Sequence, residues 1–194
     1  MAITYGLEDK LYINLTNRCT NDCEFCVRNF KDGVGDYNLW LDKEPTTREI
    51  INNIGDASAY NEIIFCGYGE PMIRLEEIKE ISNYLKNDYP KVPIRINSNG
   101  QANLIHNRNI LPEISDLIDS ISISLNAHNS KSYQKICKST FSDKAFPAII
   151  EFISEAKKYI SEVRVSVVDY PEVDIDSCSK LAKKLNVPLK IRRF

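Results

Sequence analysis

Short runs rich in isoleucine, valine and leucine recur along the chain, and Asn, Gly, Ser or Pro residues flank them. Runs of this length and composition are typical of β-strands buried in a parallel sheet. The flanking polar residues indicate where a strand stops and a turn begins. The predicted strands are Leu11–Leu15, Glu62–Cys66, Val92–Asn97, Ile121–Leu125, Val163–Val168 and Pro188–Arg192.

Between these runs, apolar residues recur at the spacing of one helical face, as in Leu75, Ile78, Ile81 and Leu85. Helices are predicted over Thr46–Tyr60, Leu75–Lys86, Ile110–Asp119, Asp143–Ile160 and Ile175–Leu185. Strands that alternate with helices pair in parallel through right-handed crossovers. The pattern therefore predicts an α/β protein with a parallel sheet.

Two architectures are compatible with this alternation, a partial (β/α)6 TIM-like barrel and an open doubly wound sheet. Six strand–helix units without a glycine-rich turn after the first strand favour the partial barrel. The chain shows no repeat, low-complexity tract or linker, so we expect residues 1–194 to form a single domain. In both architectures ligands bind at the carboxyl ends of the strands, so the residues after each strand are the candidate site.

Three cysteines follow the first predicted strand, Cys19, Cys23 and Cys26, in the spacing C-x3-C-x2-C. Three thiolates in one loop can hold a metal, but most iron–sulfur clusters and structural zinc sites use four protein ligands. A site with an open position is more often chemical than structural. A structural zinc site with a distant fourth ligand is the alternative. Against it, the chain has no second C-x2-C, and its only histidines are His106 and His128.

Polar segments also follow the next three strands. Gly67 and Gly69 flank a tight turn in which the backbone can approach a ligand closely, and Glu70 can accept from a cationic group. Ser98-Asn99-Gly100 and Ser124-Leu125-Asn126 offer hydroxyl and amide groups suited to a hydroxylated, zwitterionic ligand. Each of the last two segments, taken alone, is more typical of an ordinary turn at a strand end.

Composition narrows the function classes. The 194 residues are 43% hydrophobic and 27% charged, with a net charge of −2 and both signs mixed, which predicts neither membrane nor direct nucleic-acid binding. The N-terminus lacks the apolar core of a secretory signal, so we expect a cytoplasmic protein whose six cysteines are ligands or buried thiols. Cys66, Cys137 and Cys178 are far apart, so we expect no second cluster, and Cys137 and Cys178 are predicted to pack as small hydrophobic residues.

The cysteine motif with Phe25 directly before its third cysteine, followed by Gly67–Pro71 and the two serine segments, resembles the radical S-adenosylmethionine (radical SAM) superfamily. The resemblance extends from Leu11 to Arg192. It implies that the three cysteines of the motif bind three irons of a [4Fe–4S] cluster, and that the fourth iron chelates the amino and carboxylate groups of S-adenosylmethionine (SAM).

The resemblance also implies contacts between SAM and residues that follow the strands. The implied set is Phe25 against the adenine, Gly69 and Glu70 at the methionine amino group with Gly67 in the same turn, and Ser98, Ser124 and Asn126 at the ribose and carboxylate. The implied reaction is reductive cleavage of SAM to methionine and a 5′-deoxyadenosyl radical, which abstracts hydrogen from an unidentified substrate. The alternative is an activating enzyme that generates a radical on a partner protein.

A narrower resemblance concerns Leu11–Cys19, Cys26–Arg28 and Leu39–Pro45, which are similar to a radical SAM subgroup associated with TatD-type nucleases. It implies a functional link to such a nuclease. An electron donor of the flavodoxin or ferredoxin type is the other implied partner.

Three further features lie near the expected site. The long irregular stretch Arg28–Glu44 is a candidate substrate lid or docking loop, although Tyr37 and Trp40 within it are equally suited to packing on the first helix. Arg192 and Arg193 are suited to a carboxylate or phosphate, or form a solvated basic end. His128 follows the fourth strand and is a candidate proton donor or a solvated loop residue.

Overall fold

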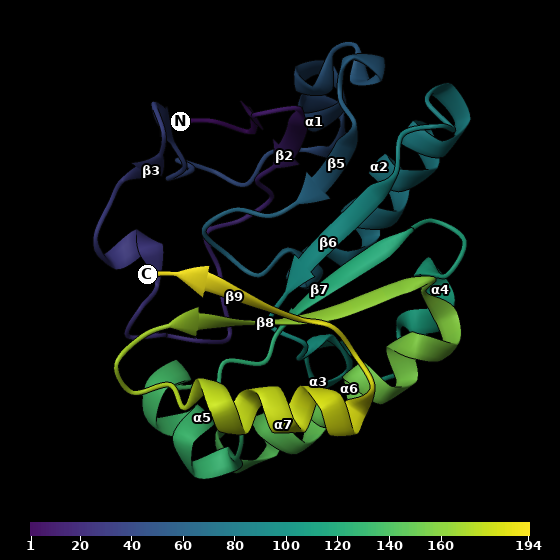
Figure 1. The fold of residues 1–194 in the computed structure, drawn as a ribbon. Helices are drawn as coiled ribbons and strands as arrows, with labels where there is room; N and C mark the ends of the chain where they lie inside the picture. Colours follow the sequence, from purple (N-terminus) through teal and green to yellow (C-terminus); the bar gives the residue numbers. More distant parts are fainter.

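The computed structural model describes residues 1–194 and contains one curved sheet with helices packed along its outer face (Figure 1). The sheet has seven strands in the order β1-β2-β5-β6-β7-β8-β9. Their bounds are β1 Thr4–Leu7, β2 Lys10–Ile13, β5 Glu62–Phe65, β6 Ile94–Ser98, β7 Ser120–Ser124, β8 Glu162–Asp169 and β9 Leu189–Arg193. β1 is antiparallel to β2, and every other neighbouring pair is parallel.

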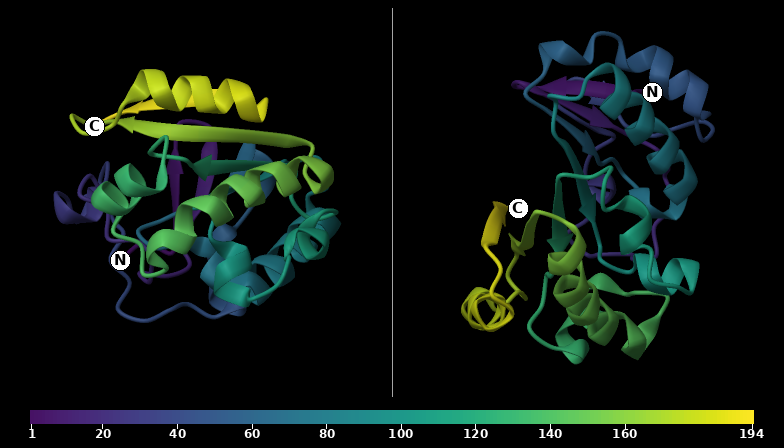
Figure 2. Two further views of the ribbon diagram at one scale, coloured as in Figure 1. Left: turned by 90° about the horizontal axis from the view of Figure 1, so that it is seen from below. Right: turned by 90° about the vertical axis from the view of Figure 1, so that its right-hand side faces the viewer.

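The six parallel strands stand in the sheet in the same order as in the chain. A doubly wound sheet reverses its strand order at a switch point, and this sheet has no reversal. Successive crossovers of one hand place the helices on one face, so the sheet curls (Figure 2). The predicted partial barrel of parallel strands is confirmed. The antiparallel edge strand β1 was not predicted, because it is only four residues long and is set by its hairpin with β2.

The helices partly match the predicted ranges. Their bounds are α1 Thr47–Ile54, α2 Leu75–Asp88, α3 Ala102–His106, α4 Leu111–Ile114, α5 Ser130–Cys137, α6 Ala145–Tyr159 and α7 Ile175–Leu185. α1 begins at a capping box between Thr46 and Glu49. Its last residue is Ile54, six residues before the predicted end at Tyr60, because Gly55 has a φ of 64° that breaks the helix. The short helices α3 and α5 were not predicted, because too few turns are present to show helical periodicity.

The two faces of the sheet differ in chemistry because successive strand residues point to opposite faces. Isoleucines such as Ile96 in β6 and Ile121 in β7 are fully buried and belong to the main hydrophobic core of 42 residues. Each such burial stabilises the fold by roughly 1.5–3 kcal/mol. Alternate positions carry polar groups, including Arg95, Ser122 and Ser166. The concave face is therefore polar, and it is available to a ligand.

The segment Arg28–Glu44 is anchored to the N-terminal edge of the sheet. It contains a two-stranded hairpin, β3 Gly33–Val34 and β4 Tyr37–Asn38. The Tyr37 ring lies 5.7 Å from that of Tyr5 in β1, and the Trp40 ring lies 5.1 Å from that of Tyr68. Tyr37 therefore packs on β1, and Trp40 packs on the glycine turn. No helix in the structure is both long enough and apolar enough to cross a bilayer.

Candidate functional site

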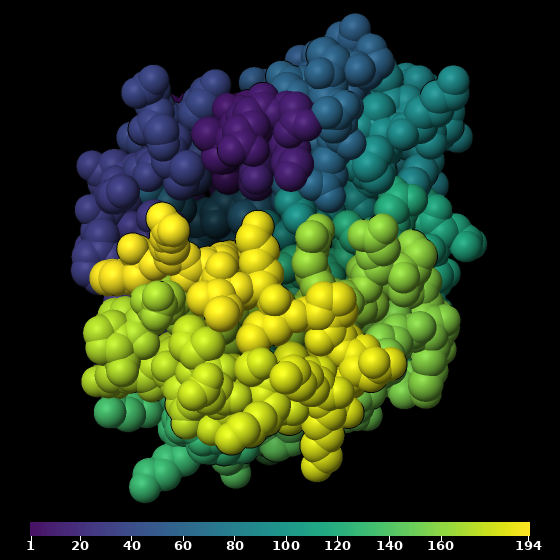
Figure 3. Space-filling view, viewed as in Figure 1, coloured from purple at the N-terminus to yellow at the C-terminus, as the bar shows by residue number.

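A cavity of about 660 Å³ lies at the carboxyl ends of the parallel strands. The space-filling view shows a hollow between the purple N-terminal strands, the indigo segment after the cysteines and the yellow C-terminal strand (Figure 3). Every predicted site residue lines this cavity: Cys19, Cys23, Cys26, Phe25, Gly67, Gly69, Glu70, Ser98, Ser124 and Asn126. The structure thus brings together residues that are more than a hundred positions apart in the sequence.

The cysteine loop follows β2 and is held against the carboxyl end of α5 by backbone hydrogen bonds. The Asp22 amide donates to the Cys137 carbonyl at 3.0 Å, and the Glu24 amide donates to the Ile136 carbonyl at 3.0 Å. The last carbonyls of a helix have no partner within it, so the loop satisfies them. The loop amides gain fixed acceptors in return, and this defines the path of the chain between the cysteines.

A buried network of polar side chains supports the same loop. The Gln101 side-chain amide donates to Asn21 Oδ1 at 2.8 Å and to the Tyr133 hydroxyl at 2.9 Å. Asn21 Nδ2 donates to the same hydroxyl at 2.8 Å, and the Thr20 hydroxyl donates to Gln101 Oε1 at 2.9 Å. Gln101 and Tyr133 belong to no motif that the sequence indicates as functional. Their only sequence signal is that Gln101 belongs to the polar segment after β6.

The glycine turn after β5 packs directly on the start of the cysteine loop. The Glu70 amide donates to the Arg18 carbonyl at 2.8 Å. A Cβ atom on Gly69 would overlap the carbonyl oxygens of Thr16 and Arg18, and one on Gly67 would overlap the Asn14 side chain. Both glycines are therefore required by close approach of the two segments, and this approach places Glu70 beside the cysteines.

The Glu70 carboxylate is buried at the cavity wall. Its Oε1 accepts from the Met72 amide at 3.0 Å, and its Oε2 accepts from the Asn99 amide at 2.6 Å. Burial raises the pKa of Glu70 to about 7, although these amide donors act in the opposite direction. The carboxylate joins the turn after β5 to the turn after β6. Each of its oxygens keeps acceptor capacity beyond the amide bond that it receives.

The three thiols lie in a low-dielectric environment. Burial and the nearby Glu70 raise the pKa of Cys19 to about 12, and burial raises the pKa of Cys26. A hydrogen bond to the Cys137 thiol, together with burial, raises the pKa of Cys23. Cys137 is fully buried, as predicted, and Asn126 Nδ2 donates to its sulfur at 3.9 Å. The thiolate forms therefore require a compensating positive charge, which metal ions supply.

The donor set is compatible with a multinuclear cluster. No three His, Cys, Asp or Glu side chains converge closely enough to hold one metal ion. A [4Fe–4S] cluster offers each thiolate its own iron, so its ligands need not meet at one point. The Asn21 amide donates to Cys19 Sγ at 3.4 Å, and Asn99 Nδ2 donates to it at 3.9 Å. Hydrogen bonds to ligand sulfur are a usual feature of such sites.

The remaining predicted contacts form the other walls of the cavity. Phe25 is buried, and its ring lies 5.6 Å from that of Tyr170, which leaves an aromatic surface beside the cysteines. Ser98 Oγ accepts from the Gly100 amide at 3.0 Å and caps the turn after β6. Ser124 ends β7, and Asn126 follows it with a left-handed φ of 55°. Hydroxyl and amide groups thus face the cavity from two neighbouring strands.

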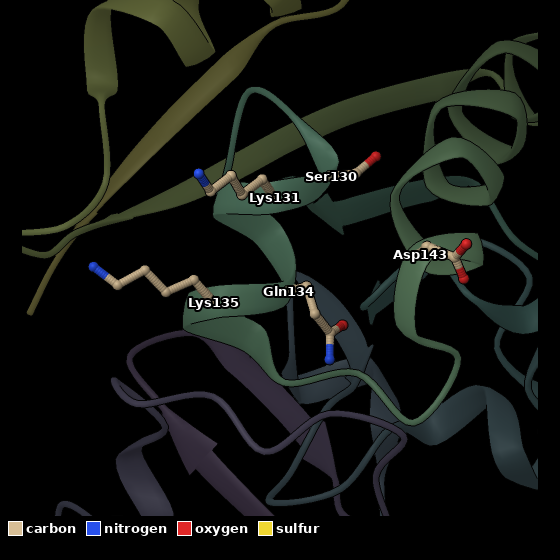
Figure 4. A pocket seen from close by; sticks show the side chains of 5 residues that line it. All are labelled: Ser130, Lys131, Gln134, Lys135 and Asp143. Carbon is tan, nitrogen blue, oxygen red and sulfur yellow. The ribbon is translucent and has the colours of Figure 1, made fainter.

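Other candidates lie outside this cavity. His128 is not part of its lining, and Asn129 Nδ2 lies 2.6 Å from His128 Nε2. A second pocket, on the surface of α5, is lined by Ser130, Lys131, Gln134, Lys135 and Asp143 (Figure 4). In that view the two lysine side chains point away from Gln134 and Asp143, so the polar groups do not converge on a ligand position.

Comparisons with known proteins agree with this arrangement. The chain is 25% identical over 175 residues to an uncharacterized protein of Methanocaldococcus jannaschii, covering 90% of this chain and 52% of the relative. The structure of anSMEcpe with bound SAM (AdoMet) matches with a TM-score of 0.65 at 15% identity, over 94% of this chain and 50% of that one. The FeFe-hydrogenase maturase HydG from Carboxydothermus hydrogenoformans matches with a TM-score of 0.57 at 17% identity, over 95% of this chain and 43% of that one.

The chain therefore spans about half the length, or less, of the relatives that it matches. The structural likenesses are below 25% identity and show the fold alone. The family model of the Radical SAM superfamily matches residues 13–185, a range that runs from the last residue of β2 to the end of α7 and holds the cysteine loop and the glycine turn. By this match over most of its length, the chain belongs to the radical SAM superfamily.

Proposed function

We propose that this protein is a radical SAM enzyme that cleaves SAM reductively and acts on an unidentified substrate. The single observation that carries the proposal is the shared cavity, in which the three cysteines, the glycine turn and the polar strand ends all meet. When bound, a reduced [4Fe–4S] cluster and SAM supply a 5′-deoxyadenosyl radical that takes hydrogen from the substrate. The protein supplies binding, orientation and exclusion of water.

In this proposal Cys19, Cys23 and Cys26 are the cluster ligands. Each thiol must lose its proton to bind iron, and the buried loop disfavours the thiolates until iron charge is present. The network around Gln101 holds the loop between its first two cysteines in one conformation. The protein therefore presents its ligands in a largely organised geometry, which lowers the entropy cost of assembling the cluster.

The SAM contacts are proposed for the cavity walls beside the cysteines. Glu70 and the backbone beside Gly69 receive the methionine amino group, and an ammonium ion placed there would favour the ionised carboxylate. Phe25 offers an aromatic surface to the adenine. We propose that the ribose and carboxylate are bound by Ser98, Ser124 and Asn126. Gly67, in the same turn as Glu70, is a further proposed cofactor contact.

The partners and the location stay predictions. An electron donor of the flavodoxin or ferredoxin type is required by the proposed chemistry, since one electron enters for each SAM cleaved. The TatD-associated subgroup, with its link to a nuclease, is supported only by the motif resemblance. The cytoplasmic location is supported by the cysteine usage discussed above.

The test is anaerobic reconstitution with iron and sulfide, followed by dithionite and SAM. We expect the visible absorption that is typical of an iron–sulfur cluster, and we expect 5′-deoxyadenosine to form. Both signals should be lost in Cys19→Ala. Cys178→Ala is the matched control, because Cys178 is buried in α7 and does not line the cavity. A fully loaded protein that binds SAM and forms no 5′-deoxyadenosine would contradict the proposed activity.

A further inference from the structure

The cavity has a second side that the proposed cofactor contacts do not use. It is formed by Lys31, in the segment after the cysteines, and by Arg192 and Arg193 at the end of β9, together with the aromatic residues Phe30 and Phe194. The hollow in Figure 3 opens between this yellow strand end and the indigo segment. A substrate that reaches the SAM site must therefore lie against these residues.

The charges on this side are unneutralised. Glu70 is the only acidic side chain in the cavity lining, and backbone amides already bind both of its oxygens. Neither Lys31 nor Arg192 forms an ion pair with a carboxylate, whereas Arg193 is the register partner of Asp169 on β8. Most other arginines form an ion pair: Arg18, Arg28, Arg74, Arg95, Arg108 and Arg164.

Arg192 is held in place without being neutralised. It is half-buried, and its Nη2 donates to the Ser166 hydroxyl at 2.6 Å. Arg164 precedes Ser166 by two residues on β8 and so lies on the same concave face, where it shares the carboxylate of Glu62 with Arg95. The Nε atoms of Arg95 and Arg164 are buried and have no hydrogen-bond partner. The concave face thus carries Arg95, Arg164 and Arg192 with the carboxylates of Glu62 and Glu162, and Arg192 is the arginine among them that lines the cavity.

The aromatic residues add a surface suited to an apolar or planar group. The Phe194 ring lies 5.3 Å from that of Phe30 and 5.2 Å from that of Tyr170, in edge-to-face arrangements. The side chains of Phe30 and Phe194 are 57% and 63% exposed, so much of their surface is free to contact a ligand. Arginine forks bind carboxylates and phosphates through paired hydrogen bonds, and a partly buried fork loses little of this attraction to screening.

We propose that the substrate of this protein is an anionic small molecule whose carboxylate or phosphate is bound by Arg192, with Lys31 across the opening. The proposal rests on the proposed function only in placing the substrate in this cavity. It assigns the C-terminal strand to substrate recognition and the cysteine side to the cofactors.

The test is anaerobic titration calorimetry of the reconstituted protein with SAM, using three probes that share one ring. Uridine 5′-monophosphate carries a phosphate, orotate carries a carboxylate, and uridine carries neither. We expect at least one anion to bind at least about ten-fold more tightly than uridine. A preference for the monophosphate identifies a phosphate site, and a preference for orotate identifies a carboxylate site.

Variants then assign the binding to these side chains. The double variant Lys31→Gln/Arg192→Gln is expected to lose the anion preference. Lys31→Gln alone, which changes an exposed side chain, is expected to weaken this preference and serves as the test if the double variant does not fold. Arg48→Gln is the matched control, since Arg48 is an exposed, unpaired arginine on α1, away from the cavity.

Two results would overturn the proposal: no anion binds more tightly than uridine, or Lys31→Gln and the double variant bind the anions as Arg48→Gln does. Formation of 5′-deoxyadenosine is measured separately in the same preparations. Anion binding through Arg192 without any SAM cleavage would refute the radical function and leave the anion site standing. SAM cleavage without an anion preference would refute the anion site and leave the radical function standing.

Discussion

Replacing Gly69 with alanine tests the close approach between the glycine turn and the cysteine loop. The new Cβ would overlap two carbonyl oxygens and lie 2.9 Å from the Thr16 carbonyl carbon, whereas ordinary contacts begin at 3.4 Å. Neither segment is a flexible side-chain end, so the backbone must separate by at least about 0.5 Å, the difference between these two distances. Overpacking of this kind costs about 1–3 kcal/mol.

The separation also weakens the hydrogen bond from the Glu70 amide to the Arg18 carbonyl, a further loss of about 0.5–1.5 kcal/mol. We therefore expect Gly69→Ala to lower the free energy of unfolding of the apoprotein by about 1.5–4.5 kcal/mol, the sum of these two losses. Because Arg18 directly precedes Cys19, we also expect less iron to be bound after reconstitution.

The measurements are urea denaturation followed by circular dichroism, and iron and sulfide content after reconstitution. Gly6→Ala is the matched control, because its Cβ would lie 3.7 Å from the nearest Tyr60 atom, an ordinary contact. We expect the control to be as stable as the wild type or slightly more stable. Equal stability and equal iron content in the Gly6 and Gly69 variants would refute the reasoning.

Two further substitutions test the buried polar groups. The folded pKa of Glu70 is about 7 and its ordinary value is 4.5, so between these values the folded state binds more protons than the unfolded state, and stability falls as pH rises. Between pH 4.5 and pH 7.5 the free energy of unfolding of the wild-type apoprotein should fall by up to about 3 kcal/mol more than that of Glu70→Gln, as measured by urea denaturation. A difference between the two proteins that does not change with pH would contradict the raised pKa. Tyr133→Phe leaves the Asn21 and Gln101 amides without their shared acceptor, so we expect a loss of about 2–4 kcal/mol and reduced iron binding. Tyr84→Phe, on the surface of α2, is its control, and equal losses in both variants would contradict a role for the network.

The sequence was informative where local pattern decides the structure. The strand at Glu62–Cys66 was placed within one residue, and helix Ile175–Leu185 was placed without error, because burial and periodicity are written in consecutive residues. The predicted site residues could be found because parallel strands bring their carboxyl ends to one edge. The position of a residue directly after a predicted strand was therefore enough to identify it as a candidate site residue.

Only the tertiary structure showed what surrounds these residues. Tyr133 is 112 positions from Asn21, and Gln101 is 80 positions from it, yet all three share one buried network. Nothing in the local pattern distinguishes these side chains from solvated ones, because their partners depend on how the sheet curves and where α5 ends. The same holds for Arg192, whose place at the cavity follows from the position of β9 at the edge of the sheet.

The sequence by itself determined the alternation of strands and helices, the cysteine spacing and the polar strand ends, because each depends on residues that are neighbours in the chain. The tertiary structure decided that the glycine turn contacts the cysteine loop, that Cys137 contacts Cys23 and that Arg192 lines the same cavity as the cysteines. These contacts join segments that only the curvature of the sheet brings together, and their energies depend on burial, which a linear pattern does not record.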